Sequence, residues 1–578
     1  MPTETRQCRK CTTQFIIEPQ DFEFYAKVKV PPPTFCPDCR MQRRMAFRNE
    51  RSLYKDNCDL CKKAIVSTFS QDKPFTVYCR DCWNSDKWDP TEYGRDYDFK
   101  QSFFEQFHDL MKVVPRVNFS LAGIAINSEF TNFCVNVKDV YLSVSTLDSE
   151  NVIYSRFIDN GKDVLDCTNS KKIERCYENI DATNNYLCNF VIQTRDSSES
   201  NFLYDCVNCQ ACFMSSNLRN KQYVFRNKQR TKDQYLQLLK ENDTGDYRKL
   251  EVLYVEFEAL VKSSLHKFAN VVKAVNSSGD NIENAKNSHV VFDSFNIENV
   301  KFSIRVPGGK DVYDLYGGAR SELLYEGTAM GLDSNNCQFG YISPTNSNSQ
   351  YIDWCKNCSD VFGSVGLQKK QYCIFNKQYS KEAYFELKEK IIAQMKEVPF
   401  VDPSGNQYRF GEFFPICFSY FAYNETLAAE YFPMTKEAAL AAGYQWRDPD
   451  PSPHKQTLSA ANLPNHINDT TESVLKEVLG CTGCGKSYKI IKQEFDLLKA
   501  SGVALPRLCA DCRYWHRFSQ RNPLKLWQRN CLCGQSKWQN KAEHFHGAGK
   551  CPNEFQTPYA PERPEVVYCE QCYQAEVI

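Results

Sequence analysis

The sequence predicts a mainly β protein in which two copies of one strand-rich module lie between two cysteine-rich ends. Paired cysteines recur at both ends, a central segment repeats without a gap, and short β-prone runs recur through the middle. The chain of 578 residues has 71 Lys and Arg against 71 Asp and Glu, so its formal net charge is zero. Any attraction to nucleic acid must therefore come from local patches.

The two ends share a pattern of cysteine pairs. One pattern opens the chain and the other, with the same spacing, lies near its end: Cys8, Cys11, Cys36 and Cys39, then Cys481, Cys484, Cys509 and Cys512. Two such pairs supply the tetrahedral four-sulfur shell that Zn²⁺ prefers, and in a reducing compartment they are typical of metal sites rather than disulfides. We expect structural zinc, because four thiolates leave no position for a catalytic water. The alternative is a set of buried thiols without a ligand.

A second cysteine set follows at each end. The first of these is Cys58, Cys61, Cys79 and Cys82, and at the other end we expect Cys531, Cys533, Cys569 and Cys572. The latter choice rests on Cys531, which matches Cys58, and on Tyr568-Cys569, which resembles Tyr78-Cys79. A site that recruits Cys551 or His546 instead stays open, and His544 is a further candidate. The sequence thus predicts about four Zn²⁺ sites.

Arginines follow the last cysteine pair of each pattern. An offset of 473 residues aligns the two ends and pairs Arg40, Arg44 and Arg48 with Arg513, Arg517 and Arg521. A spacing of four residues places three guanidinium groups on one helical stripe. Such a stripe, with the nearby rings of Tyr514 and Trp515, suits contact with a phosphate backbone and with stacked bases. The alternative is a helix face whose arginines pair with acids elsewhere in the fold.

These residues carry a resemblance to a known family. Cys8-x2-Cys11, Gln20-Asp-Phe-Glu-Phe-Tyr25 and Pro33-Thr-Phe-Cys-Pro-Asp-Cys-Arg40 resemble the family called probable zinc-ribbon domain, and Leu505-Pro-Arg-Leu-Cys-Ala-Asp-Cys-Arg513 is similar. Over its whole length the chain resembles large zinc-ribbon proteins of uncultivated, small-genome bacteria. The resemblance implies zinc and tandem zinc ribbons at both ends. It implies nothing about a substrate, because no function is established for the family.

The middle of the chain is an internal duplication. With an offset of 149 residues, 15 of the 33 positions from Cys206 to Leu238 are identical to those from Cys355 to Leu387. Within each copy, β-prone runs such as Asn151-Val-Ile-Tyr-Ser and Asn299-Val-Lys-Phe-Ser recur between Asn, Asp, Ser and Gly. Short strands at even spacing predict either a sandwich or a stacked solenoid. We favour a parallel β-solenoid (β-helix), because identical coils can stack Val, Ile, Leu and Cys into one core.

Each solenoid module is expected to end in a helical cap. A capping box at Thr231-Lys-Asp-Gln234 and a cap at Ser380 mark the starts of the two helices. Basic residues precede them, and Arg226, Lys228 and Lys377 are candidate contacts to nucleic acid. The expected order is tandem zinc ribbons at 1–90, the first module at 91–242, a helical connector and the second module at 243–398, an aromatic segment and linker at 399–480, and tandem zinc ribbons at 481–578.

The cysteines of the middle segment are expected inside the coils. Cys134, Cys167, Cys176, Cys188 and Cys337 occur where a small apolar residue would stack. For the pairs Cys206/Cys209 and Cys355/Cys358 we favour packing in the coil, and a metal site shared with other thiols is the alternative.

The sequence therefore predicts a non-catalytic zinc-binding protein with nucleic acid as its partner, RNA being favoured. A protein–protein interaction scaffold and a carbohydrate-active β-helix enzyme are the two alternatives. The chain has no phosphate-binding loop, zinc-protease motif or nucleophile elbow. It also has no apolar run long enough to cross a membrane and no secretory signal, so we expect a cytoplasmic protein that does not bind membranes.

Overall fold

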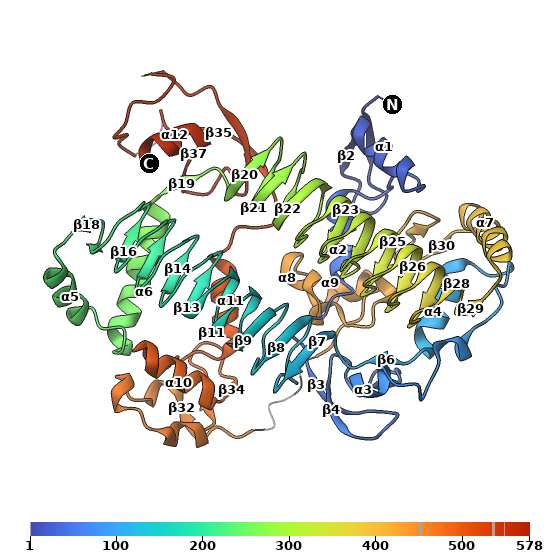
Figure 1. Ribbon diagram of the computed structural model, residues 1–578, viewed down its shortest axis with the longest axis horizontal. Helices are drawn as coiled ribbons and strands as arrows, with labels where there is room; N and C mark the ends of the chain where they lie inside the picture. The colour runs from blue at the N-terminus through green and yellow to red at the C-terminus, as the bar shows by residue number, and fades with distance from the viewer. Residues whose placement is uncertain (1, 449, 451–453, 535–537, 548, 578) are drawn as a thin grey trace. The chain divides into compact units, whose positions relative to one another are not determined.

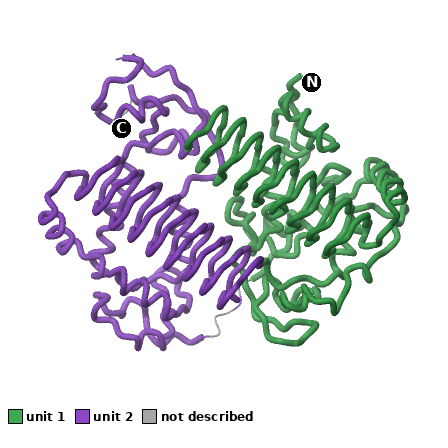
Figure 2. Tube along the Cα trace, viewed as in Figure 1, with its two compact units in different colours: residues 1–120, 271–448 green, residues 121–270, 449–578 purple. Residues whose placement is uncertain are grey.

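The computed structural model describes residues 2–448, 450, 454–534, 538–547 and 549–577. It consists mainly of strands, most of them in two parallel sheets (Figure 1). The chain divides into two compact units, each drawn from two distant segments (Figure 2). Unit 1 contains residues 1–120 and 271–448, and unit 2 contains residues 121–270 and 449–578. Each cysteine-rich end therefore joins the module that is further from it in sequence, and the units do not follow the five consecutive domains expected.

The first ladder, residues 121–229 of unit 2, is a series of short strands in sequence order. Its strands are β7 (Leu121–Ile126), β8 (Cys134–Lys138), β9 (Leu147–Ile153), β10 (Arg156–Asp159), β11 (Lys162–Leu165), β12 (Thr168–Lys171), β13 (Glu174–Ile180), β14 (Asn189–Ile192), β15 (Asn201–Tyr204), β16 (Phe213–Ser216), β17 (Val224–Phe225) and β18 (Lys228–Gln229). Asn189 pairs in parallel with Asn201, and Asn201 with Phe213, so each partner lies twelve residues further along. The antiparallel pair β17–β18 closes the ladder.

The backbone of this ladder has a second, shorter period. Every third residue from Phe133 to Arg226 has a positive φ, as at Asn184 (φ 56°) and Leu187 (φ 52°). Asn and Asp tolerate this left-handed conformation better than most residues, which explains their spacing in the sequence. Their side chains also bond along the ladder: Asn184 donates to Asp196 at 2.7 Å and Asn136 to Asp148 at 2.9 Å. Four three-residue steps thus bring the chain back into register after twelve residues.

The second ladder, residues 271–378 of unit 1, has the same design. Its strands are β20 (Val271–Val275), β21 (Gly279–Lys286), β22 (Val291–Lys301), β23 (Lys310–Tyr316), β24 (Glu322–Thr328), β25 (Asn335–Tyr341), β26 (Ser347–Asp353), β27 (Ser359–Val365), β28 (Gln371–Ile374) and β29 (Lys377–Gln378). Lys310 pairs with Glu322, twelve residues on, but Glu322 pairs with Asn335, thirteen residues on. This one-residue insertion explains why the two ladders differ by 148 residues before it and by 149 after it.

The interior of each ladder contains an apolar cluster together with buried Ser, Thr and Asn side chains. Val164, Val191 and Leu203 are buried there in the first ladder, together with Cys134, Cys167, Cys176, Cys188, Cys206, Cys209 and Cys212. Cys337, Cys355, Cys358 and Cys373 are buried in the second. The expected burial of these thiols is confirmed. Among the described residues, Cys206/Cys209 and Cys355/Cys358 belong to no metal-binding group of three or more side chains.

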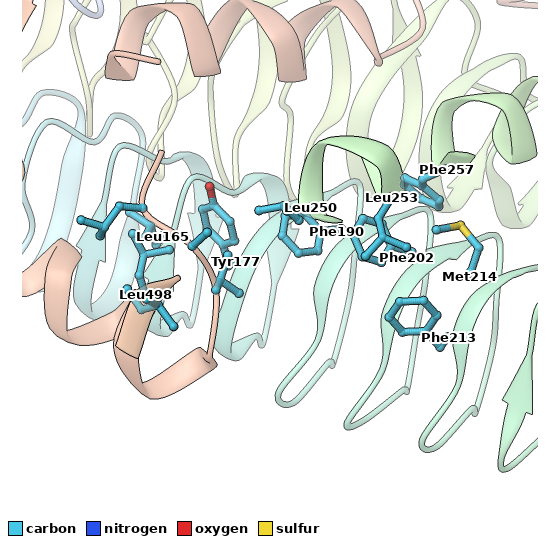
Figure 3. Close-up of a cluster of buried hydrophobic side chains, with 14 of the residues drawn as sticks. Leu165, Tyr177, Phe190, Phe202, Phe213, Met214, Leu250, Leu253, Phe257 and Leu498 are labelled. Carbon is cyan, nitrogen blue, oxygen red and sulfur yellow. The ribbon is translucent and has the colours of Figure 1, made fainter. Parts of the chain in front are cut away.

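Helices cover the ladders and their ends. The expected cap helices are present as α5 (Lys232–Glu241), whose capping box joins Thr231 and Gln234, and α7 (Lys381–Glu397), capped by Ser380. The connector α6 (Tyr247–Ser263) lays Leu250, Leu253 and Phe257 on aromatic side chains of the first ladder (Figure 3). Burying these side chains contributes about 2 kcal/mol each. No described helix is long and apolar enough to cross a membrane.

The cysteine-rich ends are short hairpins followed by helices. In unit 1 they are β1 (Glu4–Gln7), β2 (Gln14–Ile17), α1 (Pro19–Lys27), α2 (Pro37–Met45), β3 (Tyr54–Asn57), β4 (Ala64–Ser67), β5 (Val77–Tyr78) and α3 (Arg80–Trp83). In unit 2 they are β33 (Leu479–Gly480), β34 (Ser487–Tyr488), α10 (Lys492–Ser501), α11 (Ala510–Ser519), β35 (Trp527–Asn530), β36 (Glu554–Thr557), β37 (Val566–Tyr568) and α12 (Glu570–Val577).

The remaining α-helices and strands lie outside the two ladders and the two cysteine-rich ends. They are α4 (Phe103–Val113), β6 (Arg116–Val117), β19 (Leu265–Lys267), β30 (Phe400–Val401), β31 (Gln407–Tyr408), α8 (Leu427–Tyr431), α9 (Lys436–Ala441) and β32 (Leu458–Ser459). Within the aromatic segment and linker expected at 399–480, residues 449 and 451–453 lie outside the described residues.

Candidate metal centres

Three of the expected cysteine sets come together as compact groups. In each of them the four sulfur atoms lie within 4.8 Å of one another: Cys8, Cys11, Cys36 and Cys39; Cys58, Cys61, Cys79 and Cys82; Cys481, Cys484, Cys509 and Cys512. The Sγ–Sγ distance is 3.6 Å for Cys11–Cys36 and 3.7 Å for Cys484–Cys509. Zn–S bonds of about 2.3 Å give a tetrahedron with edges of about 3.8 Å. These groups therefore have the size of a four-thiolate zinc shell, and all 29 cysteines are free thiols.

The local fold explains how each group forms. A hairpin turn carries the first cysteine pair, and the second pair lies at the start of a helix, where Cys36, Cys79 and Cys509 are the N-caps of α2, α3 and α11. The backbone N–H groups of these same residues donate to Cys8, Cys58 and Cys481 at 3.2 Å each. Although burial raises the pKa of Cys481, backbone N–H donors lower it further, to about 6. The thiolate of Cys481, the form that binds a metal, is thus favoured.

The fourth group differs from the expected set. Cys531, Cys569 and Cys572 lie together with Cys551, and Cys533 belongs to a different group. Cys551 Sγ lies 3.9 Å from Cys569 Sγ and 3.8 Å from Cys572 Sγ. Cys551 precedes Cys569 by eighteen residues, as Cys61 precedes Cys79. Counting back from the last pair would have found Cys551. The spacing after Cys531 predicts the wrong ligand, because an inserted segment, residues 532–550, separates Cys531 from Cys551 whereas only residues 59–60 separate Cys58 from Cys61.

The inserted segment brings a further set of possible ligands. Cys533, His544 and His546 lie with Cys572, and their ligand atoms are within 4.8 Å of one another. His546 Nε2 lies 3.3 Å from Cys533 Sγ and 3.4 Å from Cys572 Sγ. Cys572 is therefore a member of two adjacent groups.

The arginines are not exposed. Arg40, Arg44 and Arg48 are buried to at least 96%, as are Arg513 and Arg517, and the Arg521 side chain is 7% exposed. The exposed basic stripe expected from their spacing is therefore absent. Arg40 and Arg44 share one face of α2, and Arg513 and Arg517 share one face of α11; both faces lie against a ladder. Arg48 and Arg521 lie beyond the ends of these helices, so the expected stripe of three is not formed.

Two arginines in each unit hold one buried aspartate. Arg513 Nε donates to Asp166 Oδ2 at 2.7 Å and Arg517 Nη1 to Asp166 Oδ1 at 2.6 Å. In unit 1, Asp314 accepts in the same way from Arg40 Nε at 3.0 Å and from Arg44 Nη1 at 3.0 Å. We call this arrangement the aspartate clamp. It ties α2 to the second ladder and α11 to the first, and each of these helices carries the second cysteine pair of its group.

The other predicted contact residues are mostly engaged within their units. Arg48 donates to Glu50 at 2.6 Å and Arg521 to Asp181 at 2.9 Å. Arg226 pairs with Glu256 at 2.5 Å and Lys377 with Asp96 at 2.6 Å. Lys228 is exposed. Sequence reasoning did not single out Arg43, which binds the carboxylates of Glu326 and Glu412. The sequence does show that this position differs between the two ends, because His516 matches Arg43.

No protein-family model matches the chain, and the comparison with curated proteins finds no match.

Proposed function

We propose that this protein is a non-catalytic, zinc-stabilised scaffold that binds protein partners along its two strand ladders. In this proposal the zinc ions hold the cysteine-rich ends together, and those ends act as braces on the ladders. The aspartate clamp carries the proposal, because it turns arginines of both cysteine-rich ends inward instead of offering them to a polyanion. We infer further that the ladders are β-solenoids and the ends zinc ribbons.

The arginines favour a scaffold over a nucleic-acid reader. A buried guanidinium that is paired with Asp166 or Asp314 cannot contact a phosphate backbone without unfolding its helix from the ladder. Four-thiolate shells leave no position for a reacting water.

The walls of the ladders offer a repeating polar surface. Exposed amides and carboxylates follow one another along columns, as in Asn184–Asp196 and Asn336–Asn348, which bond at 2.7 and 2.9 Å. Adjacent strands are about 4.8 Å apart, so donors and acceptors recur at that spacing. Such a wall suits the backbone and polar side chains of a protein partner. The free thiols throughout the chain are consistent with a reducing compartment, which we infer to be the cytoplasm.

The proposal is tested by purifying the full chain from cells with its partners. The wild type is compared with a wall variant, Asn184→Arg with Asn208→Arg, and with a control, Lys486→Ala, which changes an exposed residue outside the ladder. We expect protein partners that survive nuclease treatment, are lost with the wall variant and are kept with the control. Loss of all partners on nuclease treatment would return nucleic acid as the ligand.

A further inference from the structure

The adjacent groups that share Cys572 have the form of one centre for two metal ions. We propose that the carboxyl-terminal end holds a binuclear zinc cluster in which the Cys572 thiolate bridges two ions. Cys531, Cys551 and Cys569 complete one shell, and Cys533, His544 and His546 complete the other. This inference rests on the proposed structural zinc sites and adds a fifth ion to them.

The distances fit a second tetrahedral shell. Zn–N bonds of about 2.0–2.1 Å and Zn–S bonds of about 2.3 Å place a nitrogen and a sulfur ligand about 3.5 Å apart. The observed separations from His546 Nε2 are 3.3 Å to Cys533 Sγ and 3.4 Å to Cys572 Sγ. A neutral imidazole between two sulfur atoms has the position of a ligand to the same ion.

His544 has the hydrogen bonding of a metal ligand. Its side chain is 2% exposed, and its Nε2 lies 3.0 Å from Glu576 Oε1. Its Nδ1 is buried and has no hydrogen-bond partner among the described residues. Histidines that bind zinc usually donate their other N–H to a carboxylate or carbonyl, which orients the ring and fixes the tautomer. An ion on Nδ1 would satisfy the unpartnered atom.

Charge also favours a shared thiolate. A four-thiolate zinc site is a dianion, whereas five thiolates around two zinc ions make a monoanion. All five thiols of the centre are buried: Cys531, Cys533, Cys551, Cys569 and Cys572. A lower net charge reduces the free-energy cost of burying the cluster away from water. The second ion therefore lowers the charge of the first shell, and it also links the ligands of the inserted segment, Cys533, His544 and His546, to Cys572.

The test counts zinc in the full chain by native mass spectrometry after dialysis against a competing chelator. We expect five ions in the wild type, one for each compact group, and four in Cys533→Ser and in His546→Ala. Cys417→Ser and His454→Ala, which lie outside the groups, should keep five. Cys569→Ser should lose one ion and Cys572→Ser two, because only Cys572 serves both shells.

Four ions in the wild type would overturn the second site and leave the four structural sites standing. Equal losses from Cys569→Ser and Cys572→Ser would overturn the bridge. A count near zero would instead contradict the structural zinc sites of the proposed function.

A separate observation concerns a cavity in unit 2. Arg43 and Glu326 of unit 1 match His516 and Glu178 of unit 2. The glutamate is the same in both units, but the arginine is replaced by histidine. Arg43 Nη2 binds both carboxylate oxygens of Glu326, at 2.7 and 2.8 Å. Glu178 is also buried, at 8% exposed against 0% for Glu326, and its carboxylate accepts a hydrogen bond from Tyr254 Oη at 2.6 Å. Burial raises the pKa of this carboxyl.

A cavity of about 280 Å³ adjoins Glu178. Its charged and aromatic lining includes Glu251, Tyr247, Tyr254, His516, Arg507 and Arg513, and Arg513 is already paired with Asp166 and Glu494. We propose that it binds a ligand bearing a guanidinium group, which takes the place that the Arg43 side chain has in unit 1. The carboxylate of Glu178 accepts the planar group beside Tyr254, whereas the Tyr247 ring already faces the Arg507 guanidinium at 4.4 Å.

Titration calorimetry with methylguanidinium, and with neutral acetamide for comparison, tests this site. We expect binding of methylguanidinium to the wild type, and at least a tenfold loss of affinity in Glu178→Gln. His516→Arg should also abolish binding by filling the cavity, and it should raise the unfolding temperature unless Glu178→Gln is present. Equal binding to the wild type and Glu178→Gln, or no binding to the wild type, would overturn the site.

Discussion

Arg513 donates its Nε–H to Asp166 at 2.7 Å, and this pair matches Arg40 and Asp314 in the other unit. The match extends to the surrounding bonds. Arg513 Nη1 binds the carbonyl of Leu508 and Arg40 Nη1 that of Phe35, while Arg517 and Arg44 each reach a ladder carbonyl. The ends are duplicated and the ladders are duplicated, and in both units the same contact joins an end to a ladder.

Breaking the clamp should destabilise its unit strongly. Asp166→Ala leaves Arg513 and Arg517 buried without a counter-charge on the ladder side, and we expect a loss of about 3–5 kcal/mol in the free energy of unfolding. Asp314→Ala should do the same in unit 1. Urea unfolding measured by circular dichroism provides the values.

The matched control is an exposed ion pair. Glu4→Ala removes the partner of Arg6 at the surface, and we expect little change in the free energy of unfolding because exposed ion pairs are screened by water. Similar losses for Asp166→Ala and Glu4→Ala would show that the clamp does not hold the helix to the ladder.

The ladder positions with positive φ should be sensitive to substitution by β-branched residues. Asn184 has φ 56° and donates to Asp196. Asn184→Val places a β-branched residue in the left-handed conformation, which we expect to cost about 1–2 kcal/mol. Asn184→Gly should cost less, because glycine adopts this conformation freely. Tyr186→Val, at a nearby exposed position without positive φ, is the control and should change the unfolding midpoint little.

The sequence predicts the composition of the fold better than its connections. The repeats, the cap helices and the three regular cysteine groups follow from spacing, because hairpin turns and the pairing of strands twelve residues apart are local. The period of three residues was not recognised, although Asn184, Leu187 and Phe190 obey it, because the backbone imposes it on residues of many types. The role of Arg513 was not predictable either. Its partner Asp166 lies 347 residues away in the chain, and spacing along a helix does not tell an exposed stripe from a buried one.

His266 should make unit 2 sensitive to mild acid. The ring is buried, contacts Tyr204 Oη at 2.6 Å and Val261 O at 3.0 Å, and burial lowers its pKa from 6.5 to about 4. Between these values the unfolded state takes up a proton and the folded state does not. Stability is therefore complete above about pH 6.5 and falls as the pH drops towards 4, by up to about 3 kcal/mol.

His266→Gln removes this proton uptake. The free energy of unfolding is measured from pH 7 to pH 5 for both proteins. We expect a smaller decrease for the variant over that range. The same decrease in both would assign the acid sensitivity to other groups, the zinc thiolates among them.

Two charge reversals separate the scaffold from a nucleic-acid reader. Arg517→Glu and Lys228→Glu change the net charge by the same amount, but Arg517 is buried against Asp166 and Lys228 is exposed at the end of the first ladder. We expect Arg517→Glu to lower the unfolding temperature by several degrees, because it sets two carboxylates together in the interior. Lys228→Glu should leave that temperature unchanged. Salt-dependent retention on RNA, measured on folded protein, is expected to be weak for the wild type. A steep salt dependence that Arg517→Glu abolishes without loss of folding would mean that the guanidinium groups leave the clamp to bind phosphate.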